Sequence, residues 1–302
     1  MQNPFGQILT AMVTPFKSDL SLDFDSCEKL VNHLIKTGTD TIVVSGTTGE
    51  SPTLTHDEKI ELCKLVQKVA NKKAKIILGT GSNSTAVAVS FTKEAEKLGV
   101  DGILSVVPYY NKPSQSGLLE HFGQIAKGTS LPVILYNIPG RTGINMEPQT
   151  TALLANKYKN IIGYKDATGN LDMTTQVIQS APKGFFIYSG DDTLTLPMLS
   201  IGAVGVISVA SHIAGKEIKD MINYFFAGKI DLAQEIHHKL FPLYKALFKA
   251  PNPTCVKAAL EIIGICKQDL RPPLVKLNEK ELDELKQVMS KTIQKEYVNA
   301  TQ

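Results

Sequence analysis

The stretch DTIVVSGTTGESPTLTHDEKIELCKLVQKVA, residues 40–70, contains one complete strand and helix unit. Its first part, DTIVVSG, is a short apolar run of the kind that forms a buried strand. Its last part has apolar residues at helical spacing, with Thr55 placed to cap the helix and Glu58 three residues later to complete a capping box. A buried strand followed directly by such a helix is the repeating unit of parallel α/β folds.

The same unit recurs along the chain. The apolar runs are, in order, QILTAMVTPF, DTIVVSG, KIILGTG, GILSVVP, PVILYN, IIGYKDA, FFIYSGD and GVISVAS, with helix-like stretches between them. Eight such units by about residue 228 match the size of a closed (β/α)8 TIM barrel in the α/β class. An open, doubly wound sheet is the alternative, because alternation of strand and helix does not by itself close a barrel. The count of eight favours closure.

No further strand pattern follows the eighth run. The stretches DLAQEIHHKLFPLYKALF, NPTCVKAALEIIG and NEKELDELKQVMSKTI have helical spacing and are separated by turns that contain proline or glycine. We therefore expect a catalytic barrel over residues 1–229 and a small C-terminal helical domain over residues 230–302.

Composition narrows the possible functions. The 302 residues carry a net charge of +3 from interspersed lysines and acids, which does not indicate a nucleic-acid partner. No apolar run is long enough to span a bilayer, so we expect no membrane partner and a cytoplasmic location. The four cysteines form no C-x-x-C pair, so we expect buried free thiols. His237 and His238 are adjacent on an expected helix and cannot face one metal together, and the other four histidines are scattered, so we expect no metal site.

The run IIGYKDATG, residues 161–169, places a lysine near the end of a strand. In a barrel of this kind the active site lies at the carboxyl ends of the strands. Lys165 can be an ordinary strand-end lysine with its ammonium in water, or a buried amine whose lowered pKa lets it form a Schiff base. If Tyr164 faces the helices, Lys165 points into the barrel, and Gly163 on the same face leaves space for a small substrate.

Other strand ends favour the reactive amine. Tyr136 ends the fifth run, where its hydroxyl could relay protons, and Arg141 follows in a loop suited to hold a carboxylate. Thr47 and Thr48 lie in a turn between glycines that could bind a carboxylate or simply cap a helix. A core tyrosine and a surface salt bridge are the structural alternatives for Tyr136 and Arg141.

Together these motifs resemble the dihydrodipicolinate synthase family of class I, pyruvate-dependent aldolases. The resemblance runs from about Ile8 to Leu274 and is carried by GTTGESPTL, VPYYNKPSQSG, YNIPGRTG, GYKDATGN, SGDD and GVISV. It implies a (β/α)8 barrel with a C-terminal helical domain. It also implies a lyase that condenses pyruvate with L-aspartate 4-semialdehyde to give 4-hydroxy-tetrahydrodipicolinate for diaminopimelate and lysine biosynthesis.

The family match assigns roles by position. Lys165 would form an iminium with pyruvate, so that no external cofactor is needed, and Thr47, Tyr136 and Tyr110 would relay protons, with Tyr110 reaching into a neighbouring subunit. The match therefore implies a homodimer or homotetramer. Substrate binding would fall to Thr48, Arg141 and the backbone at Gly190 and Ile207, with Arg141 holding the carboxylate of the semialdehyde.

The chain departs from the family pattern at the site where some members bind lysine as an inhibitor. Four positions of that site match: Ser51, His56, Asn83 and Tyr109. Lys59 stands where a second histidine is expected and Val87 where a glutamate is expected. A lysine in place of a histidine would repel the effector's ammonium group, so we expect weak or no inhibition by lysine.

A second departure lies in the C-terminal region. Thr254 and Cys255 stand where the family usually has an apolar residue and proline, which leaves the start of the local helix open.

Two other functions remain as alternatives. Related barrels that make or cleave sialic acid or keto-deoxy sugar acids share the threonine turn, the tyrosine and the lysine. They lack an arginine at the position of Arg141, so Arg141 argues against that activity. A barrel retained only as a binding or scaffold protein is the other, and the intact Lys165, Tyr136 and Tyr110 argue against it.

Overall fold

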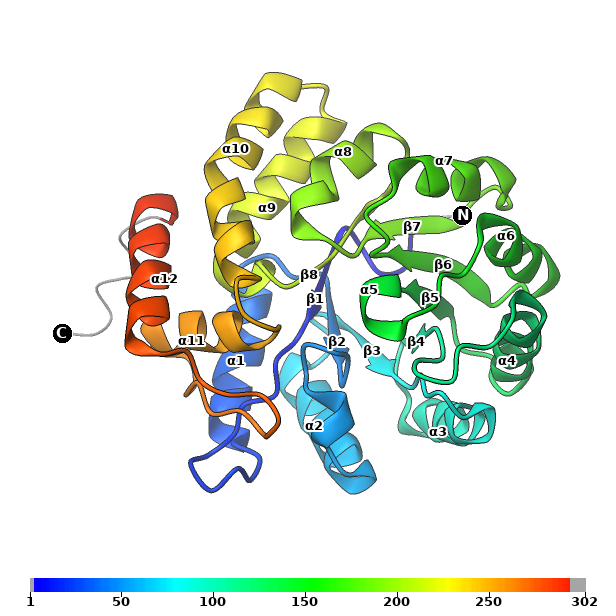
Figure 1. Ribbon diagram of the computed structural model, residues 1–302, viewed down its shortest axis with the longest axis horizontal. Helices are drawn as coiled ribbons and strands as arrows, with labels where there is room; N and C mark the ends of the chain where they lie inside the picture. The colour runs from blue at the N-terminus through cyan, green and yellow to red at the C-terminus, as the bar shows by residue number, and fades with distance from the viewer. Residues whose placement is uncertain (1–2, 294–302) are drawn as a thin grey trace. The chain divides into compact units, whose positions relative to one another are not determined.

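Eight strands form a closed barrel in chain order (Figure 1). The computed structural model describes residues 3–293 of the chain. The strands are β1 Ile8–Ala11, β2 Thr41–Val44, β3 Lys75–Gly79, β4 Gly102–Val106, β5 Val133–Asn137, β6 Ile161–Asp166, β7 Phe186–Ser189 and β8 Gly205–Ser208. Each lies in one of the eight apolar runs, so the expected closed (β/α)8 barrel is confirmed.

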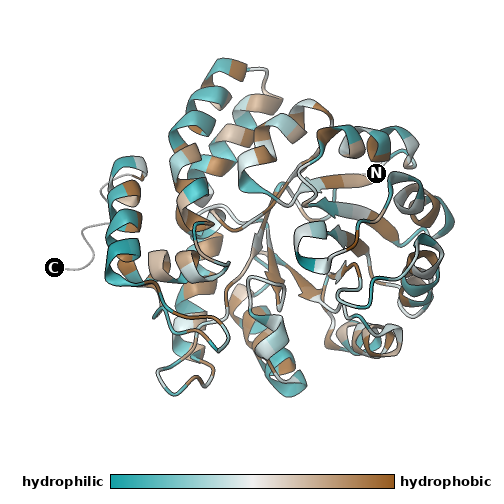
Figure 2. Ribbon diagram, in the orientation of Figure 1, coloured by the Kyte–Doolittle hydropathy of each residue, from teal (hydrophilic) through white to brown (hydrophobic). Residues whose placement is uncertain are grey.

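Helices follow the strands. They are α1 Phe24–Lys36, α2 His56–Ala70, α3 Thr85–Leu98, α4 Gln115–Lys127, α5 Pro139–Thr142, α6 Pro148–Lys157, α7 Leu171–Ser180, α8 Thr195–Ser200, α9 Ser211–Phe226, α10 Ile230–Leu247, α11 Thr254–Ile262 and α12 Glu279–Thr292, with short 3-10 turns η1 Ser51–Thr53 and η2 Asp192–Leu194. Figure 2 shows apolar residues concentrated on the strands and mixed with polar residues on the helices. This pattern is typical of helices that each bury one face.

The chain divides into two compact units. One comprises Lys75–Ile207 together with the N-terminal residues up to Gly6, and it contains strands β3 to β7 and most of β8. Its strands pair in parallel and in sequence order, and α3, α4, α6 and α7 pack against one another in the same order. Tyr188 on β7 donates a hydrogen bond to the Asn3 side chain over 2.7 Å, which ties the N-terminal segment to this unit.

The other unit comprises Gln7–Ala74 and the chain from Ser208 onward. It pairs β1 with β2 in parallel, and α10 packs against both α9 and α12 (Figure 1). The capping box expected from Thr55 and Glu58 is present at the start of α2, and Asn278 and Glu281 form another at the start of α12. These caps satisfy backbone N–H groups that the first helical turn leaves unpaired.

The three helices expected after residue 230 are α10, α11 and α12. α11 begins at Thr254, which settles the helix start that the departure at Thr254 and Cys255 left open. The domain boundary between residues 229 and 230 stays a prediction. Cys27, Cys63, Cys255 and Cys266 are buried free thiols, as expected. Within residues 3–293, none of the helices is both long and apolar enough to cross a membrane.

Candidate active site

Lys165 lies against Tyr136 at the carboxyl ends of two neighbouring strands. The two residues are register partners on β5 and β6, and the Lys165 Nζ is 4.2 Å from the centroid of the Tyr136 ring. Both side chains are buried, with 6 % of Lys165 and 4 % of Tyr136 exposed. The sequence placed these residues at adjacent strand ends, and the structure brings them into contact.

Burial lowers the pKa of Lys165 to about 8. The negative charge of Asp192 opposes this shift, and the positive charge of Arg141 adds to it. An amine with a pKa near 8 is partly neutral at physiological pH, whereas an ordinary lysine is almost fully protonated. The site can therefore supply a nucleophilic amine. This favours the interpretation of Lys165 as a reactive buried amine over that of an ordinary strand-end lysine with its ammonium in water.

The opposite face of these strands is directed at the helices. The Asn137 amide nitrogen lies 2.9 Å from the Tyr164 hydroxyl and 3.1 Å from the Met146 carbonyl oxygen. Met146 precedes α6, which packs against β6. Because side chains alternate along a strand, Tyr136 and Lys165 lie on the inner face, as the sequence predicted.

The glycine on the same face as Lys165 allows close packing. A Cβ at Gly163 would lie 3.0 Å from the Phe186 carbonyl oxygen and 3.5 Å from Ile134 Cγ1. Ile134 therefore fills part of the space that the sequence predicted beside the amine. A side chain at Gly163 would push against β7, so the glycine sets the spacing of these strands.

Arg141 lies on α5, a single helical turn that begins directly after β5. Pro139 starts the turn, and Gly143 ends it in the left-handed conformation with φ 73°. Asn137 also joins this loop to the strand, because the Met146 N–H donates to the Asn137 Oδ1 over 3.2 Å. Arg141 is exposed, yet its charge acts on Lys165. The loop thus presents a guanidinium close to the reactive amine.

Tyr110 is the most exposed of the predicted catalytic residues. Its side chain is 89 % exposed and its backbone is left-handed, with φ 73°. Its N–H donates to the carbonyl oxygen of Thr142 on α5 over 3.4 Å. A solvent-exposed tyrosine held in an unfavourable backbone conformation is suited to contact another molecule, since such strain persists only where the surrounding structure imposes it.

The ends of β7 and β8 carry the predicted backbone groups. Gly190 donates its N–H to the Asp166 carbonyl oxygen over 2.6 Å, and a Cβ there would lie 2.8 Å from Ala167 Cβ. Only glycine fits at this close approach. Ile207 is buried on β8. Asp192 follows Gly190 by two residues and is buried. Its negative charge raises the pKa of Lys165.

Thr47 and Thr48 belong to the second unit, in a tight turn after β2. The turn is closed by the Glu50 N–H, which donates to the Thr47 carbonyl oxygen over 3.0 Å. Thr48 is buried, and its hydroxyl oxygen accepts a hydrogen bond from the Asn252 side chain over 2.8 Å. The Thr14 hydroxyl donates to the Gly49 carbonyl oxygen over 2.7 Å. The turn is therefore held by its own backbone and by two other parts of the chain.

The predicted effector positions are divided between the two units. Ser51 is the first residue of η1 and accepts a hydrogen bond from the Ser45 hydroxyl over 3.3 Å, and His56 is exposed at the start of α2. In the other unit, the Asn83 carbonyl oxygen accepts from Asn111 over 2.9 Å, and Tyr109 is exposed.

The comparisons with known proteins agree with this arrangement. The model of the dihydrodipicolinate synthetase family matches residues 4–292. The chain belongs to this family. It is 51 % identical over 286 residues to the 4-hydroxy-tetrahydrodipicolinate synthase of Desulforamulus reducens, which covers 95 % of this chain and 97 % of that relative.

Solved structures give the same result. The dihydrodipicolinate synthase of Bacillus anthracis is similar with a TM-score of 0.94 and 46 % identity, over 97 % of this chain and all of that one (100 %). The enzyme of Cyanidioschyzon merolae, solved with lysine bound, has a TM-score of 0.90 and 46 % identity, over 94 % of this chain and 97 % of that one. The resemblance inferred from the motifs is thereby confirmed.

Sequence reasoning did not assign roles to three groups that contact or act on candidate site residues within their own unit. Asn137 joins the Arg141 loop to the lysine strand, Asp192 acts on the charge of Lys165, and Asn252 contacts Thr48. Asn137 and Asp192 lie in the motifs YN and SGDD, which carry that signal. Asn252 lies 204 residues from Thr48, so no local pattern indicates the contact. Among residues 3–293, no group of three or more histidine, cysteine or acidic side chains is arranged to hold a metal ion.

Proposed function

We propose that this chain condenses pyruvate with L-aspartate 4-semialdehyde to give 4-hydroxy-tetrahydrodipicolinate, the reaction for which its relatives are named. The observation that carries the proposal is the buried Lys165 amine, with a pKa near 8, packed against Tyr136 in a member of this family. The reaction belongs to the diaminopimelate branch of lysine biosynthesis.

The first stage makes a nucleophile from pyruvate. The neutral amine of Lys165 attacks the ketone carbon, and the resulting carbinolamine loses water to give an iminium. The positive iminium nitrogen withdraws electrons from the adjacent methyl group, so a proton leaves it and an enamine forms. Because the covalent iminium accepts the electrons, the proposal requires no external cofactor.

The second stage forms the product. The enamine carbon attacks the aldehyde of the semialdehyde, and a new carbon–carbon bond forms. The amino group of that substrate then attacks the iminium carbon and closes the ring, and the Lys165 amine is released. Lys165 thus returns to its starting state at the end of each cycle.

Proton transfer in these steps is assigned to Tyr136, Thr47 and Tyr110. A hydroxyl group both donates and accepts, so a chain of three can move a proton between the reacting atoms and solvent. The contact between Tyr136 and Lys165 supports the first assignment. The exposure of Tyr110 supports the proposal that it serves the site of a neighbouring subunit, in a homodimer or homotetramer.

Substrate binding is assigned to Thr48, the backbone at Gly190 and Ile207, and Arg141. The Gly190 N–H donates to the Asp166 carbonyl oxygen, which fixes the backbone at this position. Arg141 would pair with the carboxylate of the semialdehyde through two parallel hydrogen bonds. The sugar-aldehyde acceptor of a sugar-acid aldolase carries no carboxylate to pair with Arg141, so the Arg141 loop favours the synthase over that alternative.

The test supplies purified protein with pyruvate and one acceptor at a time: L-aspartate 4-semialdehyde, N-acetylmannosamine or glyceraldehyde. We expect pyruvate consumption with the semialdehyde alone. Consumption only with a sugar aldehyde would move the chain to the sugar-acid aldolases, and inactivity with all three would contradict the proposal. Lys183→Ala, a change at an exposed lysine, is the matched control for Lys165→Ala and should retain activity.

A further inference from the structure

A hydrogen bond links the threonine turn to the segment before α11. The Asn252 side-chain nitrogen donates to the Thr48 hydroxyl oxygen over 2.8 Å, and both residues are buried. Breaking a buried hydrogen bond is costly, because it leaves polar groups without water to replace the lost partner. The bond therefore fixes the Thr48 hydroxyl group and not only the backbone of the turn.

The direction of this bond decides what Thr48 can do. A threonine hydroxyl has one hydrogen to donate and two lone pairs that accept. Since Asn252 donates to the oxygen, the Thr48 hydrogen points away from Asn252 and is available to a second acceptor. A carboxylate is such an acceptor, and it has no hydrogen of its own to offer when ionised.

A buried ion pair holds the same turn two residues later. Lys257 on α11 is 0 % exposed, and its ammonium group donates to Glu50 Oε1 over 2.7 Å and to the Asp269 carbonyl oxygen over 2.5 Å. Glu50 itself has a left-handed backbone, with φ 54°. This conformation is unfavourable for a residue with a side chain, so the pair with Lys257 fixes a turn that would otherwise relax.

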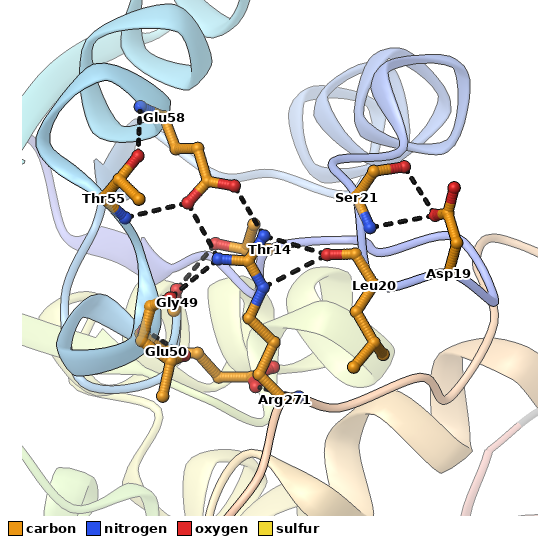
Figure 3. Close-up of polar contacts among 10 residues, drawn as sticks. Thr14, Asp19, Leu20, Ser21, Gly49, Glu50, Thr55, Glu58 and Arg271 are labelled. Atoms are coloured by element: carbon orange, nitrogen blue, oxygen red, sulfur yellow. Dashed lines mark hydrogen bonds and ion pairs between the residues drawn. The ribbon is translucent and has the colours of Figure 1, made fainter.

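A third contact joins the segment after α11 to the helix that follows the turn (Figure 3). The Arg271 N–H donates to Glu50 Oε2 over 3.0 Å, and its guanidinium group donates to both carboxylate oxygens of Glu58 over 2.7 and 2.5 Å. The guanidinium also donates to the Thr53 carbonyl oxygen over 2.7 Å. Glu50, two residues after Thr48, is therefore held by both Lys257 and Arg271.

We propose that Asn252 is a positioning residue that orients the Thr48 hydroxyl as a hydrogen-bond donor to the carboxylate of pyruvate. The inference rests on the proposed function, since it requires pyruvate at Lys165. It gives the C-terminal helical region a part in substrate binding, through one side chain that acts on Thr48. Its effect falls on the affinity for pyruvate, because the carboxylate is present before and after each chemical step.

The experiment compares Asn252→Leu, Thr48→Val and the double variant. Leucine has a similar volume to asparagine but cannot donate, so the Thr48 hydroxyl loses its fixed direction. We expect Asn252→Leu to raise the KM for pyruvate roughly tenfold, with kcat and the KM for the semialdehyde little changed. In the Thr48→Val variant, adding Asn252→Leu should raise the KM for pyruvate by less than about twofold, because the hydroxyl group that Asn252 orients is absent.

Two controls separate positioning from folding. Asn223→Leu makes the same replacement on the exposed face of α9 and should leave both KM values unchanged. Asn252→Ala provides a smaller replacement if the leucine variant does not fold. The pyruvate concentration that gives half-maximal borohydride trapping measures binding without turnover, and it should rise with the KM.

The outcomes distinguish this inference from the proposed function. If the wild-type protein neither traps nor consumes pyruvate, both are wrong. If the wild type is active and Asn252→Leu or Asn252→Ala leaves the KM for pyruvate unchanged, the inference alone is wrong. It is also wrong if the effect of Asn252→Leu persists in full in the Thr48→Val background, because Asn252 would then act without Thr48.

Discussion

At the scale of single residues, burial and two charged neighbours set the pKa of Lys165. Burial lowers its pKa to about 8, Asp192 raises it and Arg141 lowers it further. In the proposed reaction the neutral amine of Lys165 is the nucleophile, so the rate of iminium formation should rise with pH and level off above about 8. Stopped-flow or quenched trapping of pyruvate over pH 6–10 measures this profile without the second substrate.

Two substitutions should move that profile in opposite directions. Arg141→Leu removes a positive charge, so the inflection should shift to higher pH, and Asp192→Asn removes a negative charge, so it should shift to lower pH. Shifts with the opposite signs, or no shift in either variant, would show that these charges do not set the pKa of the amine.

We expect Lys59 and Val87 to make the protein insensitive to free lysine. Lys59 lies on α2 and is partly buried, Val87 is exposed on α3, and neither offers a carboxylate to the ammonium of an effector. We expect half-maximal inhibition only above the millimolar range. The double variant Lys59→His, Val87→Glu should be more sensitive, whereas sub-millimolar inhibition of the wild type would contradict this account.

At the scale of elements, the ion pair between Glu58 on α2 and Arg271 links two segments that are far apart in the sequence (Figure 3). The hydrogen bonds from Arg271 lower the pKa of Glu58 from 4.5 to about 2. Because the folded pKa is the lower one, this contribution to stability is complete above about pH 4.5 and is lost as the pH falls towards 2. Its size is on the order of 2–3 kcal/mol.

The variant Glu58→Gln isolates the ion pair. Glutamine can still complete the capping box with Thr55, so α2 keeps its cap while the charge is removed. We expect the free energy of unfolding to fall by about 2 kcal/mol at pH 7 and the difference from wild type to shrink below pH 4. Urea unfolding at both pH values measures it, and an equal loss at pH 7 and pH 2.5 would contradict the assignment.

At the scale of the whole molecule, the barrel follows from local patterns in the sequence. Each strand lies within a mostly apolar run, and the capping box at Thr55 and Glu58 is readable from spacing alone. The pairing of Tyr136 with Lys165 follows because they end consecutive strands. The contacts of Thr48 with Asn252 and of Glu50 with Lys257 join residues more than 200 positions apart, so only the folded chain reveals them.

The proposed assembly can be tested by mixing inactive chains. If Tyr110 serves a neighbouring site, a dimer of one Tyr110→Phe chain and one Lys165→Ala chain has one complete site. Random reassembly from equal amounts of the two variants should restore about a quarter of wild-type activity. A mixture that stays as inactive as either variant alone, although exchange of subunits is verified, would place Tyr110 in its own site or outside any site.

The most direct test of the account is to identify the amine that binds pyruvate. Protein incubated with pyruvate and reduced with borohydride should carry one covalent adduct per chain, which peptide mass spectrometry should locate on Lys165. The adduct should be absent from Lys165→Ala and present in Lys183→Ala. An adduct on another lysine, or full labelling of Lys165→Ala, would contradict the central claim that this strand-end lysine is the catalytic amine.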